Sequence, residues 1–244
     1  MIAAVVNLTP GVGRTTLAVN LAGELALQGR RVALLDVDGC AGSRDWAGMR
    51  RANTLPALFD TIAITSSQLR CGLWGLGTRF DHILLDTPSR SPAAVRAVLL
   101  AAETVLVPTL PDPEAMGRSA ATMQLVTEAL AVEPSLTASL VLTRVADGLA
   151  VDPGAAATVL GLRLPVIEEV IRERRTFAES RSTGLLVPEL EMAGRAEAEV
   201  RHLVSEVFGW GSASSAGWSR GAVVLSDPIA KAGVQQRAKT GRRA

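Results

Sequence analysis

The chain has 244 residues, of which 48% are hydrophobic and 20% are charged, and its formal net charge is +1. This length and composition suit one large α/β domain or two small ones, and they exclude global disorder. Two cysteines and two histidines are too few for a disulfide scaffold or a histidine-rich metal site. Aromatic residues make up only 3%, so a stacking platform for single-stranded bases is excluded as well. The small number of histidines and cysteines also disfavours zinc enzymes and Ser-His-Asp hydrolases.

The two ends of the sequence differ in character. The apolar start, 1–6, is short and has no basic flank, so we expect no secretory signal. No apolar run approaches the roughly 20 residues of a spanning helix, and we expect a cytoplasmic protein without a membrane anchor. Residues 211–244 begin with GSASSAG and carry six Lys or Arg against one Asp. They predict a flexible basic tail after a domain over 1–210. This tail either holds DNA or an acidic partner or only solubilises the chain.

Apolar runs alternate with helical patterns along residues 1–208. Buried strands are predicted over 2–7, 31–36, 82–85, 104–107, 140–143 and 164–167. Helices are predicted over 15–28, 41–51, 93–102, 114–131, 153–160 and 192–208. Strands that are apolar on both faces and separated by helices indicate a doubly wound α/β fold. Its mostly parallel sheet would have about seven strands and helices on both faces. Ligands of such folds bind at the carboxyl ends of the strands.

The first predicted strand runs directly into the loop LTPGVGRTT, residues 8–16, and then into a helix. Gly11 and Gly13 allow the backbone to approach an anion, and the helix N-terminus favours negative charge. Thr15 is placed to offer its hydroxyl to Mg²⁺. The standard phosphate loop has Gly at position 8 and Lys at position 14, where this chain has Leu8 and Arg14. By itself the loop also fits an ordinary tight strand-to-helix turn.

Two further motifs follow at predicted strand ends: Asp36-Val37-Asp38 and Asp86-Thr87-Pro88. Together with the loop they resemble the ParA/MinD family of deviant P-loop ATPases. The small ParA and ParF type of plasmid partition is the most similar branch. The resemblance spans roughly residues 1–208 and implies a P-loop NTPase fold that binds ATP and Mg²⁺. Because the carboxyl ends of parallel strands share one edge, the aspartates are expected to converge there.

The resemblance assigns roles to individual residues. Asp86 would hold Mg²⁺ with the Thr15 hydroxyl, and Asp36 would support the metal shell. Asp38 would position the attacking water. Arg14 would contact the phosphates and is the second residue expected to be catalytic. The implied nucleotide-binding residues are Gly11, Val12, Gly13, Arg14, Thr15, Thr16, Asp86, Thr143 and Arg144. The alternative for each aspartate is that it caps the helix that follows its strand.

Three positions in the loop depart from the family pattern. Thr9 stands where the family has a lysine that reaches the nucleotide of the dimer partner, and Arg14 stands where it has the phosphate-binding lysine. Pro10 removes one loop N–H. We therefore expect slow ATP hydrolysis. Two interpretations stay open: a working ATP-driven switch for plasmid or chromosome partition or cargo positioning, and a catalytically impaired regulatory or binding module. Amidotransferase-like or dethiobiotin-synthase-like chemistry is disfavoured because no substrate domain is added.

The resemblance also implies partners. ATP would drive homodimerisation, and a partition or adaptor protein would stimulate hydrolysis; a heterodimer with a typical paralogue is a further hypothesis. Arg172, Arg174 and Arg175 are candidates for non-specific DNA binding, which would place the protein on the nucleoid. The alternative is a solvated helix face, because glutamates are interspersed with these arginines.

Overall fold

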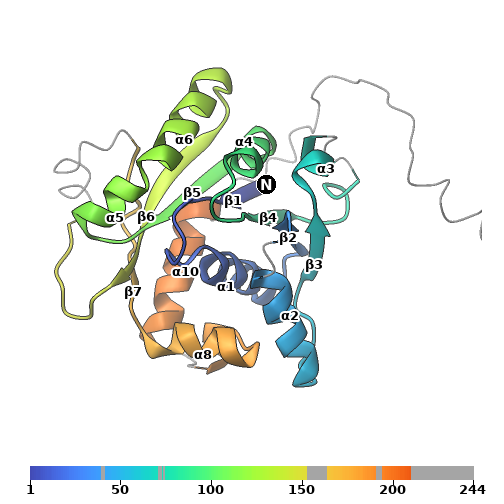
Figure 1. Cartoon of the computed structure of the whole chain (residues 1–244). Helices are drawn as coiled ribbons and strands as arrows, with labels where there is room; N and C mark the ends of the chain where they lie inside the picture. Colours follow the sequence, from blue (N-terminus) through green and yellow to red (C-terminus); the bar gives the residue numbers. More distant parts are fainter. Residues whose placement is uncertain (40–41, 71–72, 74, 153–163, 191–193, 210–244) are drawn as a thin grey trace, which may run out of the picture. The chain divides into compact units, whose positions relative to one another are not determined.

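The computed structural model describes residues 1–39, 42–70, 73, 75–152, 164–190 and 194–209 (Figure 1). All of them belong to one compact unit, Met1–Trp210. The helix predicted over 153–160 and the tail predicted over 211–244 lie outside the described residues. The proposed boundary near residue 210 therefore stays a prediction.

A central sheet of seven parallel strands has the order β3-β2-β4-β1-β5-β6-β7 (Figure 1). The strands are β1 (Ile2–Val5), β2 (Val32–Val37), β3 (Asp60–Ile64), β4 (His82–Asp86), β5 (Thr104–Thr109), β6 (Thr137–Val145) and β7 (Ile171–Arg172). The first strand, β1, lies between β4 and β5 and is buried along its whole length. The sheet confirms the predicted doubly wound α/β class.

Helices cover both faces of the sheet (Figure 1). One face carries α1 (Arg14–Leu27), α2 (Gly42–Ala52), α8 (Arg175–Thr183), α9 (Val187–Leu190) and α10 (Arg195–Phe208); the other carries α3 (Ser66–Arg70), α4 (Pro92–Ala101), α5 (Pro113–Arg118) and α6 (Ala120–Val132). Neighbouring strand residues alternate between the two cores. Leu34 and Leu84 pack with α1, whereas Leu35 and Leu85 pack with α4. This two-sided burial explains the nearly continuous apolar strand runs of the sequence.

The structure differs from the predicted elements at three places. Residues 164–167 form only an isolated bridge, Leu140 to Val166, and the edge strand is β7 instead. The strand β3 was not predicted; it is an edge strand whose residues are only partly buried. The helix expected over 114–131 is broken at Ser119 into α5 and α6. At the break, the Ser119 hydroxyl accepts a 2.9 Å hydrogen bond from the side chain of Asn7, which precedes the glycine loop.

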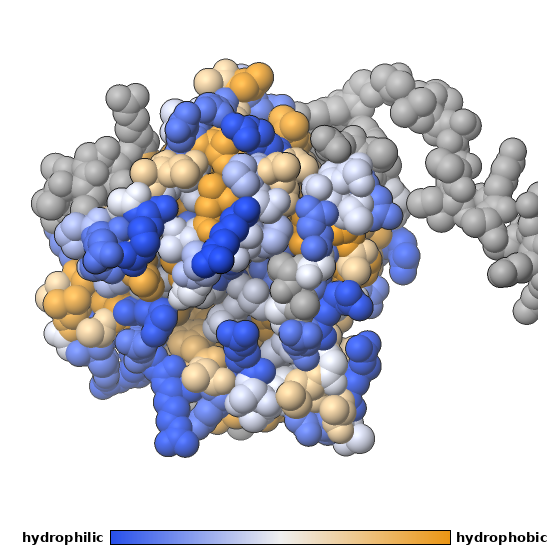
Figure 2. All heavy atoms as spheres, viewed as in Figure 1, coloured by the Kyte–Doolittle hydropathy of each residue, from blue (hydrophilic) through white to orange (hydrophobic). Residues whose placement is uncertain are grey.

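Hydrophobic and hydrophilic side chains are interspersed on the face of the molecule in Figure 2, which has the orientation of Figure 1. Among the described residues the most exposed large hydrophobic side chains are Val132 and Leu100, with 76% and 70% of their surface accessible. No helix in the described part of the chain is long and apolar enough to cross a membrane.

Candidate functional site

The loop that joins β1 to α1 has the geometry of an anion site. Gly11 and Gly13 have φ angles of +80° and +86°, in the left-handed region that glycine adopts most readily. A Cβ atom at either position would meet no atom within 4 Å, so the backbone angle and not packing favours glycine here. Within the described residues no side chain caps α1 at Gly13, and the first turn of the helix contains no acid. Its first N–H groups are therefore suited to an anionic ligand.

Asn7, which follows β1 and is fully buried, fixes the start of the loop. Its side-chain N–H₂ group donates hydrogen bonds of 2.9 Å to the Pro108 carbonyl and to the Ser119 hydroxyl. Its side-chain oxygen accepts from the Thr9 N–H at 2.8 Å and from the Thr122 hydroxyl at 3.1 Å. Asn7 is not among the residues that the sequence motifs predict for the site. The available signal was a single amide side chain between an apolar strand and a glycine loop.

A second anchor comes from the end of β6. The Thr143 hydroxyl donates to the Val12 carbonyl at 2.9 Å, and Arg144 Nη1 lies 3.5 Å from the Gly11 carbonyl. The other Arg144 amino group pairs with Glu173 at 2.7 Å. The structure therefore brings these four predicted residues, Gly11, Val12, Thr143 and Arg144, to one place.

Thr9 and Arg14, which stand where the family pattern has lysines, have side chains that point inward. The half-buried Arg14 donates through its guanidinium to the Asn7 carbonyl and so spans the loop. Thr9 is buried, and its hydroxyl donates to the Arg118 carbonyl at 3.1 Å. Arg14 consequently places a positive charge inside the loop, whereas Thr9 contributes to the junction of α5 and α6.

Asp86 lies at the carboxyl end of β4, fully buried beside the loop. Its Oδ2 atom accepts hydrogen bonds from the hydroxyls of Thr15, at 2.9 Å, and Ser43, at 3.0 Å. Asp36, also fully buried, is its register partner on β2. Burial raises the pKa of Asp86 to about 6; Asp36 adds to the rise, while Thr15, Ser43 and Arg14 oppose it.

The donor atoms at this point fit a magnesium ion. The Thr15 hydroxyl and the Asp86 carboxylate are hard oxygen ligands, and Mg²⁺ is commonly held by one or two carboxylates together with waters and phosphates. No cluster of three or more His, Cys, Asp or Glu side chains suited to a metal occurs among the described residues, so a larger protein cage is absent there. The backbone of Gly42 lies close to the Thr15 side chain: a Cβ atom at position 42 would lie 2.6 Å from Thr15 Oγ1.

Asp38 lies at the same sheet edge but points to another element. It is exposed, has a φ angle of +52°, and its Oδ1 accepts a 2.7 Å hydrogen bond from the N–H of Ser66 at the start of α3. The helix that follows the strand of Asp38 is α2, so this contact with α3 differs from the capping alternative, in which each aspartate caps the helix after its own strand. The water-positioning role of Asp38 stays a prediction. Thr16, another predicted residue of the site, is half-buried in the first turn of α1.

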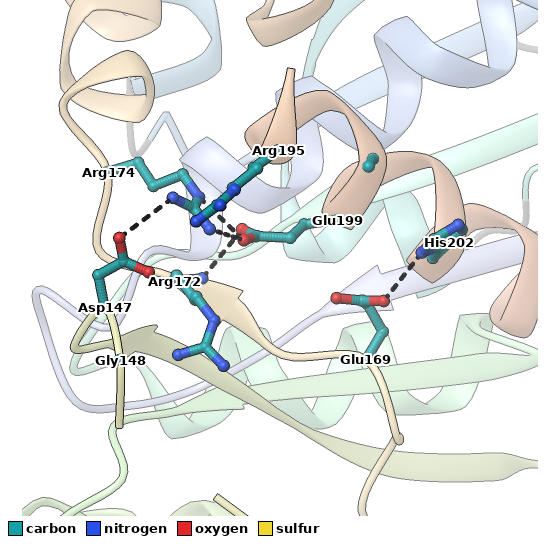
Figure 3. A pocket seen from close by; sticks show the side chains of 9 residues that line it. Asp147, Gly148, Glu169, Arg172, Arg174, Arg195, Glu199 and His202 are labelled. Atoms are coloured by element: carbon teal, nitrogen blue, oxygen red, sulfur yellow. Dashed lines mark hydrogen bonds and ion pairs between the residues drawn. The ribbon is translucent and has the colours of Figure 1, made fainter. Parts of the chain in front are cut away.

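The three candidate DNA-binding arginines have different surroundings. Arg174 is only 15% exposed and donates two hydrogen bonds, of 2.9 and 2.6 Å, to the carboxylate of Glu199 (Figure 3). Arg172 donates to two backbone carbonyls within residues 146–149. Arg175 is 90% exposed and pairs with Glu179. Ion pairing thus neutralises two of the three cations, and DNA binding stays a prediction.

Arg172 and Arg174 line an open pocket of about 640 Å³ between β7 and α10, which also includes Asp147, Arg195 and the pair His202–Glu169 (Figure 3). Its opposite charges are interspersed and partly paired. The pocket therefore does not form a uniformly basic surface.

A parallel sheet with a glycine-bearing loop, an Arg inside the loop, and a Thr–Asp pair at its mouth defines a nucleotide-binding domain of the P-loop class. Residues 3–187 match the family model of the CobQ/CobB/MinD/ParA nucleotide binding domain. The chain therefore belongs to this family, as the sequence resemblance predicted.

Individual relatives agree with this assignment. The chain is 33% identical over 215 residues to maintenance of carboxysome distribution protein A of Gloeobacter kilaueensis, covering 84% of this chain and 93% of the relative. It is 27% identical over 210 residues to the protein of the same name from Halothiobacillus neapolitanus, covering 84% and 95%. The septum site-determining protein MinD of Pyrococcus horikoshii, solved with Mg-ADP, has a TM-score of 0.67, 18% identity and coverage of 84% and 95%. This last likeness shows the fold alone.

Proposed function

We propose that the chain is an ATP-binding protein of the ParA type that positions or partitions a cargo in an ATP-dependent manner. The observation that carries the proposal is the convergence of the Thr15 and Ser43 hydroxyls on Oδ2 of Asp86 at the mouth of the loop. The two relatives named for carboxysome distribution support a positioning role.

Each part of the site would have a defined task. The N–H groups of the loop and the Arg14 guanidinium would bind the phosphates. Thr15 and Asp86 would hold Mg²⁺, with Asp36 behind them, and the metal would neutralise charge on the phosphate oxygens. Asp38 would position the attacking water, which requires its carboxylate to leave the Ser66 N–H.

The partner relations are part of the same proposal. We propose that ATP favours a homodimer and that an adaptor protein stimulates hydrolysis. We also propose non-specific contact with DNA through Arg175, which is 90% exposed and would exchange its ion pair with Glu179 for a DNA phosphate. The protein would then lie in the cytoplasm and associate with the nucleoid where DNA is bound. DNA contact of this kind weakens steeply with added salt, which gives it a direct test.

A second candidate function is a catalytically impaired module that binds nucleotide without useful turnover. Two observations favour it. Thr9 is neutral and buried, so it contributes no charge at the rim of the loop. The Oδ1 atom of Asp38 is engaged by the Ser66 N–H at the start of α3. Loss of one preorganised charge from a transition state commonly costs about 10²–10³ in rate.

The first experiment is an equilibrium titration of Mg-ATP into the full chain and into Arg14→Ala. Arg175→Ala serves as a matched control, because it removes an exposed arginine outside the loop. We expect saturable binding that Arg14→Ala loses and Arg175→Ala retains. Absence of binding at millimolar nucleotide, from a folded wild-type protein, would contradict the proposal. A measurement of phosphate release from ATP then distinguishes the two candidate functions: turnover supports the ATP-driven protein, and binding without turnover supports the impaired module.

A further inference from the structure

Backbone strain is concentrated at the edge of the sheet that carries the loop. In the described part of the chain four residues other than glycine have a positive φ angle: Asp38, Thr54, Arg90 and Arg144. Asp38 directly follows β2, Arg90 comes four residues after the end of β4, and Arg144 is the last residue but one of β6. Such conformations are unfavourable for L-residues and persist where the surrounding structure enforces them, often at functional sites. Of the three, Arg90 has no role in the site described above.

Hydrogen bonds place Arg90 against the rim of the phosphate loop. The chain that leaves β4 runs beside the chain that leaves β1: the Thr87 hydroxyl donates to the Val5 carbonyl at 2.8 Å, and the Arg90 N–H donates to the Leu8 carbonyl at 3.2 Å. Arg90 therefore lies against the peptide that joins Leu8 to Thr9. It follows Asp86 by only four residues, so the same short segment carries the candidate metal ligand.

The charge of Arg90 is not neutralised by a neighbour. Its side chain is exposed and makes no hydrogen bond or ion pair with any described residue. Two other arginines near the loop differ in this respect, because Arg144 is paired with Glu173 and Arg118 with Glu114, both at 2.7 Å. A polyphosphate carries several negative charges, and Arg14 is the cation inside the loop. A second guanidinium at the rim would complement them with planar, bidentate hydrogen bonds.

We propose that Arg90 is a phosphate-contacting residue of the nucleotide site and binds the terminal phosphate of ATP. This inference rests on the proposed function. It gives a reason for the strained left-handed backbone at Arg90, whose N–H is bonded to the loop at Leu8, and for the neutral, buried Thr9 next to this bond. Arg90 thus contributes to discrimination between nucleoside triphosphate and diphosphate.

The test compares equilibrium binding of ATP and of ADP to the full-length wild type, to Arg14→Ala and to three further variants. Arg90→Asn removes the charge while keeping a residue type that tolerates a positive φ angle. Arg90→Lys restores the charge with the same backbone requirement as Arg. Arg96→Ala is the matched control, because Arg96 is an exposed arginine of α4 that pairs with Glu128 of α6. Circular dichroism establishes that each variant is folded.

We expect Arg90→Asn to weaken ATP about tenfold and ADP about threefold or less, as for loss of a charge-assisted hydrogen bond to one phosphate group. Arg90→Lys should recover part of the ATP affinity, because Lys restores the charge but not the bidentate hydrogen bonds, and Arg96→Ala should bind like the wild type. The proposal is overturned if Arg90→Asn binds ATP as tightly as the wild type while Arg14→Ala does not. It is also overturned if folded Arg90→Lys is as weak as Arg90→Asn. A wild type that binds neither nucleotide overturns the proposed function itself.

Discussion

Arg50 of α2 and Glu189 of α9 form a bidentate ion pair, with nitrogen–oxygen distances of 2.7 and 2.8 Å. The Arg50 side chain is only 2% exposed and also donates to the carbonyls of Pro56 and Gly184. Burial tends to raise the pKa of Glu189, but the hydrogen bonds from Arg50 and from the Leu186 N–H outweigh it, and the pKa is lowered. The pair holds the helix whose first turn places Ser43 on Asp86.

Removal of Glu189 should therefore destabilise the fold. Glu189→Ala leaves the buried guanidinium of Arg50 without its carboxylate, and we expect a loss of about 2–4 kcal/mol in the free energy of unfolding. Urea denaturation measures this loss. The control is Glu179→Ala, which removes the partner of the exposed Arg175 and should cost less than about 1 kcal/mol. Equal losses in the two variants would contradict the role of the buried pair.

Gly42 should be needed for magnesium binding. In Gly42→Ala the new Cβ would lie 2.6 Å from Thr15 Oγ1, so the Thr15 hydroxyl would have to move off Asp86. We expect the gain in ATP affinity on addition of Mg²⁺ to fall about tenfold or more. Calorimetric titrations with Mg²⁺ and with EDTA give this gain directly.

Gly48 supplies the control on the same helix, because a Cβ there would meet no atom within 4 Å. Gly48→Ala should keep the gain in ATP affinity on addition of Mg²⁺. It should also raise the free energy of unfolding by about 0.5–1 kcal/mol. If both variants lose the magnesium effect, the contact with Thr15 is not its cause.

Magnesium-dependent binding should weaken in acid. The pKa of Asp86 is raised to about 6, above its ordinary value, so the carboxyl gains a proton as the pH falls through this value. Mg²⁺ requires the ionised form, and we expect the gain in ATP affinity on addition of Mg²⁺ to decline between pH 7.5 and pH 5. Parallel titrations without metal account for protonation of the nucleotide. Asp86→Asn should show little gain in ATP affinity on addition of Mg²⁺ at any pH. A gain that stays constant in the wild type from pH 7.5 to pH 5 would refute the assignment of Asp86 as a magnesium ligand.

His82 should make the fold sensitive to acid. Burial lowers its pKa to about 4, with the N-terminus and Arg30 adding to the effect. Its ring packs edge-on against Phe208, and its Nδ1 atom is buried without a hydrogen-bond partner in the described part of the chain. Because the unfolded chain protonates this histidine first, the stabilising contribution is complete above about pH 6.5 and is lost as the pH falls toward 4. His82→Phe should lose less stability than the wild type between pH 7 and pH 5 in urea titrations. An identical pH profile would show that another group is responsible.

The fold class could be predicted from the sequence alone, and so could the sheet edge at which the candidate site lies. Strands such as 32–37 are buried on both faces, so their apolar runs are visible without a structure. Gly11, Gly13, Thr15 and Asp86 could be predicted because a local motif requires their residue types at a fixed spacing from a strand end. The positive φ angles at the two glycines follow from the same local rule.

Which distant side chains complete the candidate site, and which bind elsewhere, depends on how the strands and helices pack against one another. Asn7 with Ser119, Thr143 with Val12, and Ser43 with Asp86 are separated by between 43 and 131 residues, and no sequence pattern encodes such pairs. The orientation of Asp38 toward α3 and the pairing of Arg174 with Glu199 depend on neighbours from other elements. A side chain's residue type sets what it can bind. The packing of strands and helices sets which partners come within hydrogen-bond distance, and that is decided only when the whole chain has folded.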